Sequence, residues 1–216
     1  MNQPRIITMG DSCLSVVFDE TIEPAINARC IAIARSLESQ MAAALRDVVP
    51  TYNAVTVHFD PLHTHRNSVE RELRRLAADD SAVGEREPTP VEIPVTYGGE
   101  AGPDLAAVAQ FGGCSEQAVV QLHSAMVYRV YMIGFLPGFA YMGSVDGRIA
   151  MPRLETPRLH VAEGSVGIAG IQTGIYPCDT PGGWRIIGRT AVKMFDPSRS
   201  DPVLLKAGDR VKFTVV

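Results

Sequence analysis

The chain has 216 residues, of which 46% are hydrophobic and 20% charged, with 20 basic against 24 acidic residues for a net charge of −4. This balance is typical of a folded globular protein, and it gives no basic footprint for nucleic acid. No apolar run reaches the roughly 18–20 residues that span a bilayer, and the N-terminus lacks the apolar core of a signal peptide, so we expect no membrane partner and a cytoplasmic location.

The first part of the chain is predicted to be a small α+β unit. Short β-prone runs and helical stripes with apolar steps of three and four follow the order strand, strand, helix, strand, helix. The first helix is expected to run from Pro24 to about Val48, and Asn67 with Glu70 makes a capping box for the second. This order predicts helices covering one face of an antiparallel sheet. The expected strands are residues 5–9, 14–18 and 51–59.

A polar segment without periodicity, residues 79–90, separates this unit from the rest of the chain. It is the best linker candidate, so we expect two domains, residues 1–85 and 86–216. Asp104 and Ser115 are the expected N-caps of two further helices. From Met126 onward, short β-prone runs with glycine and proline between them predict a barrel or a sandwich. The expected strands of this part are residues 91–97, 128–133, 165–171, 184–187, 192–195, 203–205 and 211–215.

Common motifs that identify an enzyme are absent from the sequence: there is no P-loop, no dinucleotide-binding GxGxxG, no HExxH and no GxSxG. The four cysteines form no CxxC pair, so neither a zinc site nor a disulfide framework is predicted. His63 and His65 have HxH spacing but no third ligand nearby, whereas a metal centre usually needs three or four. We therefore expect no metal site made by the protein alone.

Three residues are candidates for acid–base or metal chemistry. Glu100 and Asp104 share a glycine-rich loop ahead of a helix, and such a pair could hold Mg²⁺ together with a nucleotide phosphate. The alternative is a capping Asp104 and a solvated Glu100. His123, near the end of a predicted helix, is a candidate general acid or base, and the alternative is a structural histidine.

Three aromatic residues, Phe135, Phe139 and Tyr141, lie around a Pro-Gly turn. Their even spacing would place them on one side of a regular strand. They form either an aromatic wall for a flat ligand or a partner surface, or a hydrophobic plug of the barrel.

Arg153 and Arg158 lie on a segment that is stiffened by two prolines. Two guanidiniums held in this way are suited to clamp a carboxylate or a phosphate, because arginine binds these groups bidentately. The alternative is ion pairing with Glu155 or Glu163.

Residues 164–190 are dense in glycine, which costs backbone entropy on folding. This density indicates tight turns, or backbone brought close to a ligand, a partner or another strand. Polar and aromatic side chains that could read a ligand are interleaved with the glycines: Gln172, Thr173, Tyr176, Trp184 and Arg189. The segment is expected to form one wall of a two-part groove, with residues 135–141 and the proline-stiffened segment 152–158 as the opposite wall. The groove-wall residues are Phe135, Pro137, Phe139, Tyr141, Gly174, Gly182, Gly183 and Trp184.

Five stretches in this order resemble the B subunit of bacterial ATP-dependent 5-oxoprolinase, a carboxyltransferase-domain-like family. This family is also labelled allophanate hydrolase subunit 1 and includes the KipI-type inhibitor of a sporulation histidine kinase. The stretches are YGGEAGPDL at 97–105, GFLPGFAY at 134–141, PRLETPR at 152–158, GSVGIAGIQTGIYP at 164–177 and PGGWRIIGRT at 181–190.

The resemblance implies an α+β fold, with an N-terminal ferredoxin-like α/β sandwich followed by a C-terminal cyclophilin-like β-barrel. It implies a polypeptide that works with the A and C subunits of the enzyme to hydrolyse 5-oxoproline to L-glutamate at the expense of ATP. Because phosphorylation of the lactam oxygen would create a good leaving group, such a site needs ATP, Mg²⁺ and cations. The chain has no nucleotide motif, so ATP is expected to be held wholly or partly by another subunit.

On this reading, Glu100, Asp104 and His123 are the catalytic candidates. The candidates for binding the substrate and its anionic groups are Arg153, Arg158, Gln172, Thr173, Tyr176 and Arg189. Two other functions stay open at this point: inhibition of a sensor histidine kinase, and, more weakly, a role within a biotin-dependent carboxyltransferase or allophanate hydrolase system.

Overall fold

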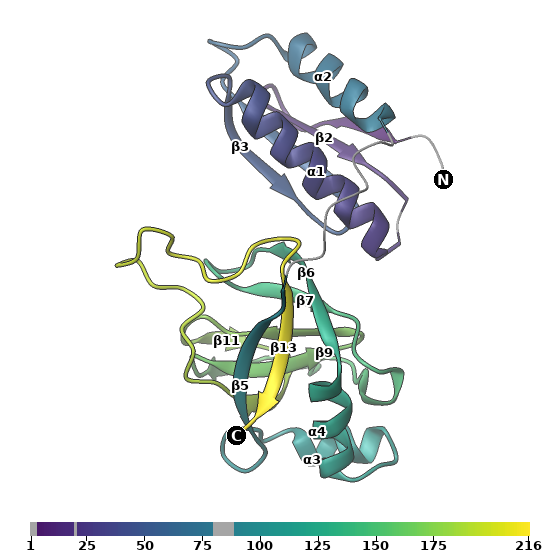
Figure 1. The fold of residues 1–216 in the computed structure, drawn as a ribbon, viewed down its shortest axis with the longest axis vertical. Helices are drawn as coiled ribbons and strands as arrows, with labels where there is room; N and C mark the ends of the chain where they lie inside the picture. The colour runs from purple at the N-terminus through teal and green to yellow at the C-terminus, as the bar shows by residue number, and fades with distance from the viewer. Residues whose placement is uncertain (1–3, 20, 80–88) are drawn as a thin grey trace. The chain divides into compact units, whose positions relative to one another are not determined.

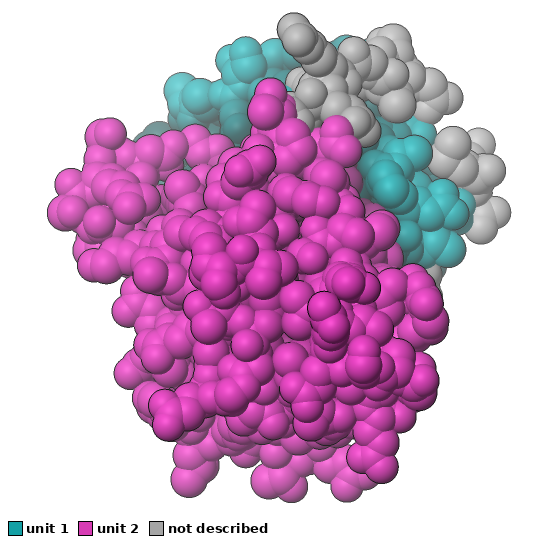
Figure 2. Space-filling view, turned by 60° about the horizontal axis from the view of Figure 1, so that its bottom comes forward, with its two compact units in different colours: residues 1–86 teal, residues 87–216 magenta. Residues whose placement is uncertain are grey.

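The computed structural model describes residues 4–19, 21–79 and 89–216 of the chain. They fall into two compact units, Met1–Arg86 and Glu87–Val216, which are coloured separately in Figure 2. The expected linker, residues 79–90, lies almost entirely outside the described residues. Among those described, no helix is both long and apolar enough to cross a membrane.

The first unit is a four-stranded antiparallel sheet in the order β1-β2-β4-β3 with two helices (Figure 1). Both helices pack on one face, because their apolar residues share a core with Leu14, Val16, Val55 and Val57. Alternation along β2 and β4 turns these side chains to the same side. The strands are β1 Arg5–Thr8, β2 Cys13–Val17, β3 Leu45–Pro50 and β4 Ala54–Phe59, and the helices are α1 Pro24–Met41 and α2 Arg66–Ala78.

The first helix is shorter than the sequence predicted. It ends at Met41, and Leu45 and Val48 lie instead in β3, which pairs with β4. Spacings of three and four continue the helical stripe by coincidence, and a short apolar run fits either period. The capping box was also wrong, because α2 begins at Arg66 without a side-chain cap and Glu70 accepts from Arg74 instead.

The second unit is a closed seven-stranded barrel in the order β10-β7-β6-β13-β5-β12-β9. All its pairings are antiparallel except that of β13 with β5, and β8 and β11 form a separate two-stranded sheet. Helices α3 Leu105–Phe111 and α4 Glu116–Ala125 lie together at one end of this unit (Figure 1). The strands are β5 Val91–Tyr97, β6 Val127–Ile133, β7 Ala140–Gly143, β8 Arg158–Val161, β9 Ser165–Ala169, β10 Gln172–Ile175, β11 Thr180–Gly182, β12 Arg185–Arg189 and β13 Arg210–Val215.

The barrel resolves the choice between barrel and sandwich, but several of its strands differ from the prediction. Strands β7, β8, β10 and β11 were missed, and residues 192–195 and 203–205 contribute only an isolated bridge between Phe195 and Val203. The expected strand 165–171 ends at Ala169, where the chain turns at Gly170 with a φ of 57°.

Much of the glycine in residues 164–190 serves the packing of one strand against another. A Cβ on Gly164 would lie 2.1 Å from the Thr190 carbonyl oxygen, and its φ of 79° is one that L side chains rarely adopt. At Gly188, a Cβ would lie 2.7 Å from a methyl carbon of Val95. Of the explanations that the sequence left open, close approach between strands accounts for these two positions.

Candidate small-molecule site

A pocket of about 380 Å³ opens in the second unit where three separate stretches of chain meet. It is called the aromatic pocket below. The turn and strand after β6 contribute Phe135, Phe139 and Tyr141, and the loop before β8 contributes residues 153–155 and Pro157. The third side is Tyr176 with residues 181–184. Its volume falls in the range of roughly 300–1,000 Å³ that is common for small-molecule sites.

Phe139 is the centre of the pocket's aromatic floor. Its ring centroid lies 4.8 Å from that of Tyr141, 5.2 Å from that of Tyr176 and 5.3 Å from that of Trp184, each in an edge-to-face arrangement. Such pairs bring the positive edge of one ring to the negative face of the next. The rings therefore support one another and present a preformed apolar surface.

Phe135 differs from its neighbours because it is 61% exposed, whereas Phe139 is 1% exposed. Residues 134–139 form a turn, closed by the Gly134 N–H donating to the Phe139 carbonyl, so the expected regular strand begins only at Ala140. Phe135 has a φ of 67°, a left-handed conformation that is uncommon for a bulky residue. Its side chain stands at the rim of the pocket, with its ring 5.7 Å from that of Phe139.

The loop before β8 is fastened by its backbone. The Leu154 N–H donates to the Gly183 carbonyl at 2.7 Å, and the Pro152 carbonyl accepts from Arg185 Nε at 3.0 Å. Arg153 and Glu155 lie on either side of Leu154, line the pocket and are exposed. Neither has a hydrogen-bond or ion-pair partner among residues 4–19, 21–79 and 89–216.

Arg158, by contrast, is part of the scaffold. It donates to Asp104 Oδ1 at 2.7 Å, while Asp104 Oδ2 accepts from the Ile186 N–H at 2.7 Å. Asp104 stands at the predicted N-cap position of α3, but its buried carboxylate makes no cap hydrogen bond, and both of its oxygens accept from these other donors. The anion clamp predicted for Arg158 and the metal or acid–base role predicted for Asp104 therefore lack support, and the partner of Arg158 is neither Glu155 nor Glu163.

His123 belongs to α4 and is fully buried, with its ring stacked on that of Phe213 in the barrel strand β13. Thr173 donates its hydroxyl proton to the Gly167 carbonyl, so it accepts from His123 Nε2 at 2.8 Å, and His123 Nδ1 then accepts from the Tyr97 hydroxyl at 2.8 Å. Burial lowers the pKa of His123 to about 3, so the ring is neutral. Both nitrogens are committed within the core, and this geometry supports the structural alternative for His123 rather than the acid–base role.

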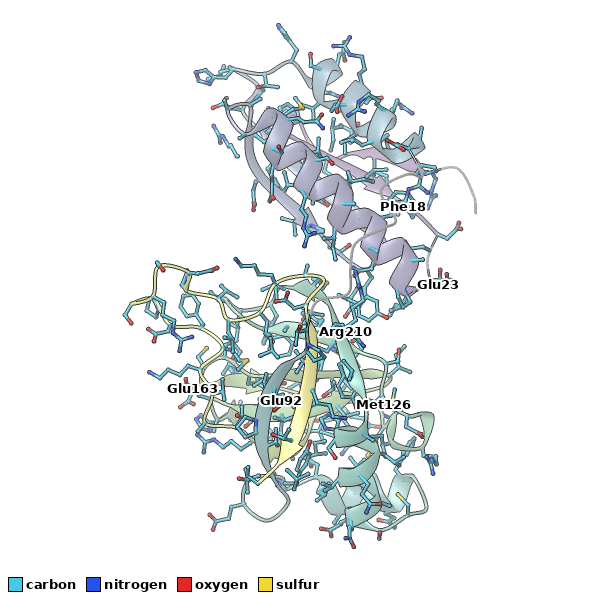
Figure 3. All side chains as sticks on the ribbon, in the orientation of Figure 1. Phe18, Glu23, Glu92, Met126, Glu163 and Arg210 are labelled. Atoms are coloured by element: carbon cyan, nitrogen blue, oxygen red, sulfur yellow. The ribbon has the colours of Figure 1, made fainter. Side chains whose placement is uncertain are left out.

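The other predicted residues are distributed around the barrel. Glu100 is exposed in its loop and Gln172 is half-buried at the start of β10, both outside the aromatic pocket. Arg189 lies at the far end of β12 and lines a second hollow of about 490 Å³. Glu163, which is labelled in Figure 3, lines the same hollow. Within the described part of the chain, no three His, Cys, Asp or Glu residues gather as a metal site.

Among the predicted groove walls, Gly182 and Gly183 line the pocket and Pro137 and Gly174 do not. Gly174 packs closely against the floor, since a Cβ there would lie 2.9 Å from the Ala140 carbonyl oxygen and 3.2 Å from the ring of Phe139. The sequence did not single out Glu155 as a site residue. The sequence feature that could have identified it is its position two residues after Arg153, on the same segment stiffened by prolines.

The comparisons with known proteins cover nearly the whole chain. Residues 4–205 match the family model described as carboxyltransferase domain, subdomain C and D. The chain is 41% identical over 222 residues to a Bacillus subtilis (strain 168) protein named as the B subunit of 5-oxoprolinase, covering 97% of this chain and 91% of that protein. A Haemophilus influenzae protein of the same name is 45% identical over 184 residues, covering 85% of this chain and 84% of the relative.

Among solved structures, one named TTHA0988 superimposes with a TM-score of 0.86 at 38% identity. The match covers 94% of this chain but 40% of TTHA0988, so the chain spans about two fifths of that protein.

Proposed function

The chain belongs to the family of 5-oxoprolinase B subunits, within the carboxyltransferase subdomain C and D proteins, and from this premise we propose that it is one subunit of an enzyme that hydrolyses 5-oxoproline to L-glutamate. The observation that carries the proposal is identity of 41–45% to proteins of that name across most of the chain. The aromatic pocket is the site in this polypeptide that we assign to the substrate.

The chemistry of the substrate fits the groups in the pocket. Hydrolysis breaks the lactam C–N bond, the carbonyl carbon gains the oxygen of water as a carboxylate, and the nitrogen leaves as an amine that takes up a proton. The five-membered ring has apolar faces that can lie against the ring edges of Phe139 and Trp184. Its carboxylate suits the unpaired guanidinium of Arg153, which can bind it bidentately.

ATP and Mg²⁺ fit this chain less well, and we propose that another subunit holds them. The predicted carboxylate pair does not supply a metal site, because both oxygens of Asp104 already accept hydrogen bonds. Glu100 is exposed, and no three His, Cys, Asp or Glu residues of the described chain gather as a metal site there. The role of this chain is then to bind and orient the lactam, in the cytoplasm where ATP is available.

The proposed partners are the A and C subunits of the same enzyme. Support comes from the name that the relatives carry, which implies further subunits, and from the greater length of TTHA0988. The exposed ring of Phe135, rather than buried Phe139, is the part of the aromatic run that a partner could contact. A histidine kinase partner is not carried forward, because no relative described above bears that name.

Reconstitution tests the proposed function. We expect the purified chain alone to show no 5-oxoproline-dependent ATP hydrolysis, and the mixture with the A and C subunits to form L-glutamate. Arg153→Ala should lower kcat/KM for 5-oxoproline by about 10- to 100-fold, the usual effect of losing a charge-assisted pair. Arg148→Ala, which removes an exposed guanidinium that pairs with Asp146, is the matched control. Absence of turnover with all three subunits present contradicts the enzyme assignment.

We also propose finer names for the two folds. The first unit has the strand order of a ferredoxin-like sheet if β1 is counted last, since ββαββα then becomes βαββαβ. The closed barrel with α3 and α4 supports the cyclophilin-like description of the second unit. Domain limits at 1–85 and 86–216 remain part of the same proposal.

A further inference from the structure

Arg153 and Glu155 give the aromatic pocket one charge of each sign. They are the only charged residues that line it among the described residues, and the remaining lining is aromatic or otherwise uncharged. Their backbone is held in place through Leu154 and Pro152, whereas both charged ends are exposed and have no partner within the described part of the chain. The pocket thus offers a cationic and an anionic anchor above an apolar floor.

Two opposite charges two residues apart can pair with each other, although an exposed pair gains little. Here Arg153 and Glu155 do not pair. A ligand that matches both must carry an anion and a hydrogen-bond donor or cation a short distance apart. A ligand with only a carboxylate would leave Glu155 without a partner and close to a like charge.

We propose that the pocket recognises an α-amino acid unit, with Arg153 binding the α-carboxylate and Glu155 accepting from the α-nitrogen. The inference rests on the proposed function and deepens it. In 5-oxoproline and in L-glutamate alike, the nitrogen and the carboxylate are bonded to the same α-carbon. Glu155 therefore accepts from the neutral lactam N–H before ring opening and from the charged ammonium afterwards, when the hydrogen bond becomes charge-assisted and stronger.

In this assignment, Glu155 determines which ligands the pocket prefers. It favours ligands with a donor nitrogen on the α-carbon and disfavours simple dicarboxylates of the same length. The side chain of the amino acid would extend over the rings around Phe139, which impose no charge of their own.

Binding to the full-length chain tests the inference directly. Trp184 is the only tryptophan and lines the pocket, so its fluorescence can follow titrations with L-glutamate, 5-oxoproline and pentanedioate, a dicarboxylate without nitrogen. We expect Glu155→Gln to weaken L-glutamate binding by about tenfold, because one charge-assisted hydrogen bond to the nitrogen is lost. The affinity for pentanedioate should stay the same or increase, because this ligand has no nitrogen and the substitution removes a like charge. Arg153→Gln should weaken both, and Glu163→Gln, outside the pocket, should alter neither.

Two results overturn the inference: wild-type chain that binds no L-glutamate at millimolar concentration, or Glu155→Gln that changes affinity for L-glutamate and pentanedioate equally. Turnover by the reconstituted enzyme distinguishes a failure of the role inferred for Glu155 from a failure of the proposed function. If 5-oxoproline is hydrolysed with the same KM by wild type and Glu155→Gln, the enzyme assignment stands and the role of Glu155 falls. If Glu155 discriminates the ligands but no turnover occurs, the binding site stands and the hydrolase assignment falls.

Discussion

The ion pair between Asp104 and Arg158 should be among the strongest single contributions to the stability of the second unit. Asp104 is 7% exposed, while the side chain of Arg158 keeps 31% of its surface. Arg158→Ala leaves a buried carboxylate without its cation. A fully buried pair broken in this way costs about 3–5 kcal/mol, and partial exposure of Arg158 reduces the expected loss to about 2–3 kcal/mol.

Asp104→Ala should cost more than Arg158→Ala. It removes the same pair and also leaves the Ile186 N–H, which lies in the buried start of β12, without its acceptor. An unsatisfied buried donor adds about 1–3 kcal/mol, so the total should be about 3–6 kcal/mol. Asp104→Asn keeps an oxygen for Ile186 and should cost only about 1–2 kcal/mol.

Urea unfolding followed by Trp184 fluorescence measures these differences in the right unit, because the first unit contains no tryptophan. A double-mutant cycle between the two alanine variants isolates the pairwise term. If Asp104→Ala and Arg158→Ala each lower the free energy of unfolding by less than about 0.5 kcal/mol, the range of ordinary surface substitutions, the pair does not stabilise the second unit.

Three further outcomes are expected from the same unfolding assay. Because burial lowers the pKa of His123 from 6.5 to about 3, the unfolded chain binds an extra proton between these values. The free energy of unfolding should fall as pH drops below 6.5, by up to about 1.4 kcal/mol per pH unit, and His123→Gln should flatten this slope; an unchanged slope contradicts the assignment. Gly182→Ala should lower the free energy of unfolding by about 1–3 kcal/mol, because its Cβ would lie 2.4 Å from the hydroxyl oxygen of the buried Tyr176. Gly183→Ala should be near neutral, because the nearest atom to its Cβ would be 3.7 Å away. Equal effects of the two substitutions would refute the steric explanation. Phe139→Ala should cost about 3–5 kcal/mol and Phe135→Ala less than about 1 kcal/mol, and the reverse order would show that the exposed ring supports the floor.

The sequence predicted a β-rich second unit, either a barrel or a sandwich, because alternating apolar runs and the glycines and prolines between them are local signals. It also singled out the three stretches that meet in the aromatic pocket. It could not tell Arg153 from Arg158, because the partner of Arg158 lies 54 residues away and meets it only when the barrel closes. The same holds for His123, whose contact with Thr173 spans 50 residues. Strands of four residues such as β7 and β8 are too short to show a period.

The loop before β8 is held by its backbone, and this determines which substitutions in the pocket the fold tolerates during evolution. Its two anchoring bonds use the amide of Leu154 and the carbonyl of Pro152, groups that every or nearly every residue provides. Arg153 and Glu155 contribute nothing to holding the loop, so a single substitution at either position alters what the pocket attracts without endangering the fold. Single substitutions at these positions can therefore change the ligand preference of the barrel. Arg158, only a few residues further along, cannot be replaced in this way without loss of its ion pair with Asp104.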